Sequence, residues 1–188
     1  MATPALQRYR DKRDFTRTPE PAHGGVADEA RPAFVVQKHW ATRLHYDLRL
    51  ELEGTMKSWA VPKGPSLDPA DRRMAVPTED HPIAYNEFEG VIPKGNYGAG
   101  QVIVWDKGFW HPLQDPHRGW REGKLKFELH GYKLRGVWNL VRMKAQDDGR
   151  PQAWLLIKDR DAYARPASAF SVTEALPQSV HALPDLPD

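Results

Sequence analysis

The alternation of hydrophobic and polar residues changes sharply near Ala33. Residues 1–32 are polar, carry repeated proline and glycine, and show no sustained apolar period. From Ala33 onward, apolar residues recur at every second position in short runs, which is the period of β-strands. Residues 161–188 are again rich in proline and small side chains. We therefore predict an N-terminal arm (1–32), a β-domain (33–160) and a C-terminal tail (161–188).

About eight short runs in the middle of the chain have the strand pattern. They cover residues 33–37, 44–52, 56–61, 72–78, 101–105, 124–129, 137–143 and 153–158. Gly54 and Thr55 separate the second run from the third, which predicts a hairpin. Long amphipathic helices are not indicated, although residues 5–14 are compatible with a short helix. The pattern predicts a mainly β fold. We expect a compact, closed or nearly closed barrel, because closure leaves few unpaired strand edges.

Composition narrows the class of protein. A chain of 188 residues with 40% hydrophobic residues suits one globular domain. Cysteine is absent, so disulfides and thiolate metal sites are excluded. No apolar run has membrane length, and no secretory leader is evident, so we expect a cytoplasmic protein. The net charge of +2 divides into −3 for residues 159–188 and +5 for residues 1–158, which weakly favours a polyanionic partner.

The stretch HYDLRLEL, residues 45–52, places an unusual set of side chains on one strand face. Its even positions are apolar, and its odd positions are His45, Asp47, Arg49 and Glu51. His45 and Asp47 emerge on the same face, within reach of a single ion. His39 lies about 20 Å away along a straight strand. It joins them only if the chain bends at residues 40–43.

Two imidazoles and one carboxylate suit Mn, Zn, Fe or Co, and they leave open positions for water or substrate. The alternative is that these histidines are structural residues held by hydrogen bonds. Arg49 favours the metal site, because a guanidinium next to a cation requires an anion between them, and phosphate is the obvious one. Farther along the chain, Pro82 holds His81 extended, Tyr85 follows, and a glycine-rich loop covers residues 90–100. Lys63 and Arg73 are further candidate anion contacts.

Three stretches resemble the phosphoesterase domain of bacterial DNA ligase D, a domain that also occurs as a free-standing protein. They are FVVQKHWATRLHYDLRLELEGTMKSWAVPKGPS, DHPIAYNEFEGVIPKGNYGAGQVIVWDKG and KLKFELHG with the later WLLIK. The resemblance covers roughly residues 10–159. It implies a compact β-barrel with short flanking helices. It also implies a manganese-dependent enzyme of non-homologous end joining, which removes a 3′-terminal ribonucleoside and then the 3′-phosphate to leave a 3′-hydroxyl.

The resemblance also implies a role for each matching residue. The manganese ligands would be His39, His45 and Asp47, a set that would also accept Zn²⁺ or Co²⁺. The scissile phosphate would be held by Arg49, His81 and Tyr85, with support from Lys63 and Arg73. In the arm, the residues that matter for activity would be Arg13, Asp14 and Glu20. Lys94 and Asn96 depart from the family pattern, which is often acidic there, but neither is a proposed site residue.

The expected substrate is primer-template DNA that ends in a 3′-ribonucleotide or a 3′-phosphate. The expected partners are the ligase, polymerase and Ku proteins of end joining, with no membrane contact, a monomeric state and a place near the nucleoid. Two other functions are compatible with the residues alone. One is a non-haem iron oxygenase that uses His45, Asp47 and His81. The other is a non-catalytic nucleic-acid-binding barrel whose exposed tryptophans stack on bases. Its candidates are Trp40, Trp105, Trp110 and Trp120.

Overall fold

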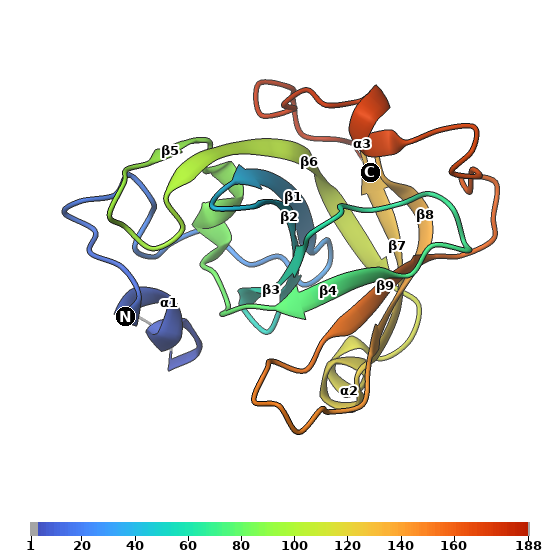
Figure 1. Cartoon of the computed structure of the whole chain (residues 1–188), viewed down its shortest axis with the longest axis horizontal. Coiled ribbons are helices and arrows are strands. Elements are labelled where there is room, and N and C mark those ends of the chain that lie inside the picture. The colour runs from blue at the N-terminus through green and yellow to red at the C-terminus, as the bar shows by residue number, and fades with distance from the viewer. Residues whose placement is uncertain (1–3, 188) are drawn as a thin grey trace.

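The computed structural model describes residues 4–187 and contains one closed antiparallel barrel (Figure 1). Eight strands close the barrel, in the order β1-β2-β3-β4-β9-β8-β7-β6, with β6 paired back to β1. The short strand β5 adds to the free side of β6. The strands are β1 (Ala33–Trp40), β2 (Leu44–Leu52), β3 (Thr55–Val61), β4 (Arg73–Pro77), β5 (Gly90–Ile92), β6 (Gly100–Pro112), β7 (Lys124–Gly131), β8 (Arg135–Arg142) and β9 (Trp154–Lys158). The prediction of a mainly β, closed barrel of about eight strands is confirmed.

The alternation of β2 places its apolar positions inside the barrel. Leu48 and Leu50 are at most 2% exposed and belong to the main core cluster, with Trp59, Trp105 and Trp138. The polar positions of β2 therefore point to the outside of the barrel wall. Most of them are nevertheless buried, so another part of the chain must cover this outer face.

The N-terminal arm and the 3₁₀ helix η2 (Ile83–Glu87) provide this cover. Tyr9 from helix α1 (Gln7–Asp11) packs with Tyr85, Phe88 and Ile92 in a second apolar cluster. Figure 1 shows the arm and β5 on the same side of the barrel. Helix α1 confirms the short helix expected in this region. The outer face of β1 and β2 is thus enclosed between the barrel wall and the arm.

Two tight turns set the register of the first three strands. The β2–β3 hairpin turns at Glu53 and Gly54, which both have positive φ (56° and 81°), as a type I′ turn requires. The β1–β2 connection spans only residues 41–43. The bend expected at residues 40–43 is therefore a hairpin.

The remaining helices are short and lie outside the barrel. Helix α2 (Pro116–Glu122) is capped by Asp115, whose side chain accepts hydrogen bonds from two backbone N–H groups, and it ends at Gly123 in a left-handed conformation. Helix α3 (Val172–Ala175) belongs to the C-terminal segment, which packs on the barrel through Val172. No helix within residues 4–187 is long and apolar enough to cross a membrane.

Candidate metal centre and phosphate pocket

Three potential metal ligands meet at the end of the β1–β2 hairpin. Antiparallel pairing places His39 of β1 directly opposite His45 of β2. His39 Nδ1 lies 3.6 Å from Asp47 Oδ2, and His45 Nε2 lies 3.2 Å from the same oxygen. One ligand atom from each residue falls within 4.8 Å of the others. Among the residues that the structure describes, this is the only such group of three.

Backbone carbonyls orient both imidazole rings. His39 Nε2 donates to the Gly98 carbonyl (2.6 Å), and His45 Nδ1 donates to the Arg43 carbonyl (3.1 Å). A carbonyl only accepts, so these two nitrogens carry the protons of the neutral rings. The other nitrogen of each ring then directs a lone pair at the Asp47 carboxylate. Such an arrangement is favourable only with a cation between the groups, either a proton or a metal ion, so the residues fit a metal ion.

The pKa shifts of Asp47 and His45 follow from this arrangement. Burial alone would raise the pKa of Asp47. Where a proton takes the place of a metal ion between these groups, hydrogen bonds from His39 and His45 and the charge of Arg49 instead hold that pKa well below its usual range. Burial lowers the pKa of His45, but the hydrogen bond and the charge of Asp47 outweigh it, and the net shift is upward. The carboxylate therefore stays ionised and attracts a cation to this position.

Arg49 extends the cluster along the same face of β2. Its Nη2 lies 3.6 Å from Asp47 Oδ2, and its Nε donates to Gln37 Oε1 at 2.8 Å. Gln37 is fully buried and is itself held by two backbone carbonyls of the η2 region. Arg49 Nη1 is buried and has no hydrogen-bond partner. Arg49 lines a cavity of about 280 Å³ with the candidate metal-ligand trio of His39, His45 and Asp47, so an anion bound in that cavity would lie beside its guanidinium.

His81 enters the cavity from the side of β3. Its backbone forms two hydrogen bonds with Met56 (2.9 and 3.1 Å), which fix its position beside the barrel wall. Its Nδ1 donates to the Glu79 carbonyl at 2.8 Å, so Nε2 is the unprotonated nitrogen of the neutral ring. Burial, together with the charges of Arg49 and Arg13, holds the pKa of His81 well below 6.5. His81 is therefore a neutral acceptor in the described structure.

The arm connects to the site through buried ion pairs. Arg13 donates to Glu20 (2.9 Å) and to Glu79 (3.1 Å), and its guanidinium lies 4.0 Å from the centroid of Tyr9. The Tyr85 hydroxyl donates to Glu20 at 2.7 Å. Burial and the charge of Glu20 raise the pKa of Tyr85 well above 10. The arm thus holds Tyr85 in place and keeps its hydroxyl protonated.

The structure gathers most, but not all, of the residues expected at the site. The predicted residues that line the cavity are Arg13, His39, His45, Asp47, Arg49, His81 and Tyr85. Glu20 lies behind them and contacts Arg13 and Tyr85. Asp14 is exposed and accepts hydrogen bonds from Thr16, whereas Lys63 is exposed beyond the end of β3. Arg73 pairs with Asp71 (3.7 Å). These last three predicted residues do not line the cavity.

Several residues at the site carried no clear signal in the sequence. Glu79 pairs with both Lys12 and Arg13, and its neighbour Thr78 has a buried, unpartnered Oγ1 in the cavity wall. Gly98 lies in the glycine-rich loop and has a positive φ of 74°. A Cβ there would lie 3.4 Å from His39 Cε1. The adjacent Tyr97 also lines the cavity.

The geometry does not favour the two other functions. His81 is not part of the metal-ligand trio, and its Nδ1 is engaged by the Glu79 carbonyl, so the oxygenase triad is not assembled. Trp105 and Trp110 are at most 1% exposed, and Trp120 stacks on a core tryptophan. Three of the four tryptophans proposed to stack on bases are thus occupied in packing.

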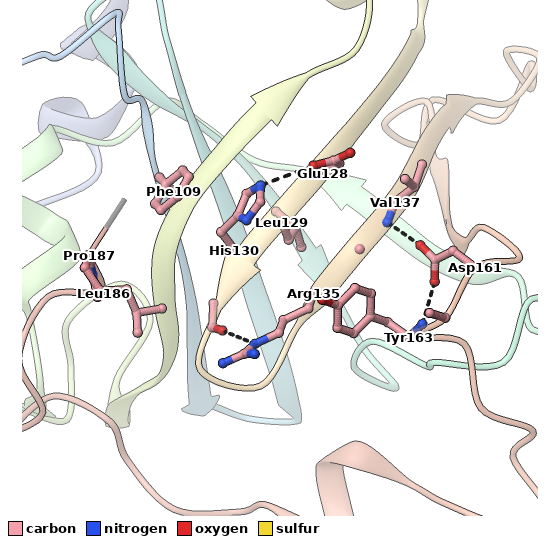
Figure 2. Close-up of a pocket in the computed structure, with 13 residues that line it drawn as sticks. Phe109, Glu128, Leu129, His130, Arg135, Val137, Asp161, Tyr163, Leu186 and Pro187 are labelled. Carbon is pink, nitrogen blue, oxygen red and sulfur yellow. Dashed lines mark hydrogen bonds and ion pairs between the residues drawn. The ribbon is translucent and has the colours of Figure 1, made fainter.

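A larger cavity of about 540 Å³ lies on another part of the barrel, between β7, β8 and the C-terminal segment (Figure 2). Its polar side chains are engaged with one another or with the backbone. His130 pairs with Glu128 (3.3 Å), and Asp161 accepts from the N–H groups of Val137 and Tyr163. The candidate site is therefore not the larger of these two cavities. It differs from the larger one in its potential metal ligands and in the unpartnered guanidinium nitrogen of Arg49.

Comparison with known proteins shows the family to which the chain belongs. Residues 37–142 match the DNA Ligase D 3′-phosphoesterase domain family. The chain is 52% identical over 177 residues to the multifunctional non-homologous end joining protein LigD of Pseudomonas aeruginosa, and this match covers 93% of the chain. It is 41% identical over 166 residues to the LigD of Mycolicibacterium smegmatis, with 78% of the chain covered, and 43% identical over 146 residues to that of Mycobacterium tuberculosis, with 73% covered. The chain spans about a fifth of the length of these relatives (21%, 22% and 18%). With a family model that matches more than half of its residues, the chain belongs to the DNA ligase D 3′-phosphoesterase domain family.

Proposed function

We propose that the chain is a divalent-metal-dependent phosphoesterase that removes blocking groups from the 3′ ends of nucleic acids. One observation carries the proposal. Two imidazole lone pairs and a carboxylate converge on one point, and a buried guanidinium nitrogen without a partner lies beside them. The first group suits a cation, and the second suits a phosphate oxygen bound next to that cation.

His39, His45 and Asp47 are the residues that would hold the ion, which we propose to be Mn²⁺, with Zn²⁺ or Co²⁺ accepted by the same ligands. The ion would act as a Lewis acid on a phosphoryl oxygen. The carbonyls of Gly98 and Arg43 fix the two imidazole tautomers in the form that binding requires. A second proton that the raised pKa of His45 favours would be released when the ion binds.

Arg49 is proposed to bind the phosphate. Gln37 anchors its Nε, so the guanidinium keeps a fixed orientation at the cavity wall, and its buried Nη1 has no partner within the protein. Thr78 Oγ1, which is also buried without a partner in the same wall, offers a second donor. Fixed donors stabilise the charge that builds up on phosphoryl oxygens during transfer, and the loss of one typically costs about 10²-fold in rate.

His81 is proposed to act as a proton acceptor. Its neutral ring presents Nε2 to the cavity, so it can take a proton from an attacking water or from a 2′-hydroxyl and return it to the leaving oxygen. Tyr85 is better suited to positioning, because its proton is committed to Glu20 and its ring lies 4.9 Å from the Arg49 guanidinium. Arg13 and Glu20 then act on the site by holding Tyr85.

The proposed substrate is primer-template DNA. A 3′-terminal ribonucleoside would be removed first, and the remaining 3′-phosphate would follow, which leaves the 3′-hydroxyl that ligation needs. Membership of a 3′-phosphoesterase domain family supports action at the 3′ end, and a cavity lined by both the candidate metal ligands and Arg49 supports a phosphate as the group that is bound. Ligase, polymerase and Ku proteins are the proposed partners, by similarity to the end-joining proteins named above.

A direct test uses a 5′-labelled primer-template that ends in one ribonucleotide, incubated with the chain and with Mn²⁺, Zn²⁺, Co²⁺ or EDTA. We expect shortening by one nucleoside and then loss of the 3′-phosphate, both abolished by EDTA. The variant His45→Ala should lose both steps while it keeps the circular dichroism spectrum of the wild type. Full activity in a folded His45→Ala protein would refute the assignment of the metal site.

A further inference from the structure

Tyr97 is a large aromatic side chain that stays exposed at the edge of the candidate site. It is 47% exposed, although tyrosine rings usually find partners in a folded domain. Among the exposed large apolar side chains of residues 4–187, only Tyr97 lines the cavity that contains the metal-ligand trio. Its position next to the site therefore calls for an explanation beyond ordinary packing.

The loop that carries Tyr97 is held in place by the arm and by the site. The next residue, Gly98, accepts the hydrogen bond that orients His39. Asn96 donates to the Arg17 carbonyl (3.2 Å), and Lys12 Nζ donates to the Tyr97 hydroxyl (3.4 Å). The Lys12 ammonium also lies 4.8 Å from the centroid of the ring. Lys12 thus holds the Tyr97 ring, and the backbone of the next residue orients the candidate metal ligand His39.

Lys12 and Arg13 lie near the Tyr97 ring, but neither depends on the ring to balance its charge. Lys12 pairs with Glu79 (3.0 Å), and Arg13 pairs with Glu79 and Glu20, so both charges are already balanced. Nearly half of the surface of Tyr97 is still open to solvent next to a polar cavity. A fixed, half-exposed aromatic ring offers a stacking surface for a flat group.

We propose that Tyr97 stacks on the base or the sugar–base unit of the 3′-terminal nucleotide and so positions its phosphate between the metal ligands and Arg49. This inference rests on the proposed function, because the terminal nucleoside is bonded directly to the phosphate that the site would bind. Stacking tolerates all four bases, which suits an enzyme that must act on ends of any sequence. Lys12 and Arg17, which are exposed beside the same loop, add positive charge for the adjoining backbone.

The test compares two primer-templates with a 3′-phosphate, one that ends in adenosine and one that ends in an abasic sugar. Stacking of one base is expected to contribute about tenfold to kcat/KM. Tyr97→Ala should therefore lose about tenfold on the adenosine end and should be unchanged on the abasic end. Tyr97→Phe should keep the preference for the adenosine end, and Tyr97→Leu, which retains apolar bulk without a π-face, should lose it.

Tyr163 provides a matched control, because it is also half exposed (50%) but lines the larger cavity. Tyr163→Ala should leave both kcat/KM values unchanged. If Tyr97→Ala slows both ends equally, or neither, the stacking proposal is overturned while the proposed function stands. If the wild-type chain releases phosphate from neither end in the presence of Mn²⁺, the proposed function fails, and the stacking proposal fails with it.

Discussion

Asp47 and Asp106 are both buried in the barrel wall, at 6% and 0% exposure, but they have opposite surroundings. Asp47 faces ionisable side chains: two imidazoles and a guanidinium. Within residues 4–187, Asp106 accepts hydrogen bonds only from backbone N–H groups. These donors are the N–H groups of Lys107, Tyr132, Lys133 and Leu134.

The difference separates a carboxylate that can bind a ligand from one that holds the main chain. The partners of Asp47 hold its pKa well below the usual range and keep it ionised beside a cavity. Burial raises the pKa of Asp106 to about 6, although four N–H groups oppose this shift. Asp106 fixes the turn between β7 and β8, whereas Asp47 leaves charge available for a ligand. The depth of burial is similar, so the chemistry of the partners decides the role.

The largest effect is expected from Asp47→Ala. We expect the rate of phosphate release to fall by more than about 10²-fold, because the proposed ion would lose its one anionic ligand. The free energy of unfolding should change by less than about 2 kcal/mol, since the partners of Asp47 are side chains that water from the adjoining cavity can solvate. Phosphate release and urea unfolding measure the two quantities. If Asp47→Ala lost stability as severely as activity, Asp47 would be a structural carboxylate like Asp106, and the comparison would fail.

Asp106→Ala should show the opposite behaviour. Four backbone N–H groups lose their acceptor, and we expect the free energy of unfolding to fall by about 3–5 kcal/mol. The activity per folded molecule should stay within about twofold of the wild type, measured at a temperature where both proteins are folded. A rate loss as large as that of Asp47→Ala would indicate that the β7–β8 turn contributes to the site.

The raised pKa of Asp106 predicts a dependence of stability on pH. Between about pH 4 and pH 6 the folded chain holds a proton on Asp106, whereas the unfolded chain, with a pKa of 3.8, does not. This group's contribution is therefore fully present below pH 4 and is lost as the pH rises through 6. The difference of about 2 pKa units corresponds to about 3 kcal/mol. Urea unfolding at several pH values measures it, and subtraction of the Asp106→Asn profile isolates it, since asparagine does not titrate. Parallel profiles for the two proteins would contradict the assigned shift.

The grouping of the candidate metal-ligand trio was partly predictable because its signal is local. The two-residue spacing in HYDLRLEL places His45, Asp47 and Arg49 on one strand face in any β-structure, and the structure bears this out. His39 required one more step, a bend at residues 40–43, and the β1–β2 hairpin provides it. The strand count and the closed barrel followed from the same period-two pattern.

The remaining partners depend on contacts between distant segments, which leave no local pattern. The carbonyl of Gly98 and the side chain of Gln37 orient His39 and Arg49 only because β1, β2 and the loop after β5 pack together. Glu79 meets Arg13 across 66 positions of the chain. Asp106, in the stretch VIVWDKG, resembles an ordinary polar residue of a turn. Its burial depends on the β7–β8 turn that folds over it.

Glu51 gives the smallest expected effect and the sharpest test of the comparison, because it shares the polar face of β2 with Asp47 yet has backbone partners like Asp106. Its two carboxylate oxygens accept from the N–H groups of Asp28 (2.8 Å) and Ala33 (3.1 Å), where the arm joins β1. Glu51→Gln keeps one acceptor, so we expect a loss of about 1 kcal/mol in the free energy of unfolding and no change in phosphate release. Glu51→Ala should lose more stability and still retain activity. A tenfold lower rate of phosphate release in a folded Glu51→Gln protein would contradict this view. It would mean that a place on the polar face of β2, and not the kind of partner, determines which carboxylates serve the reaction.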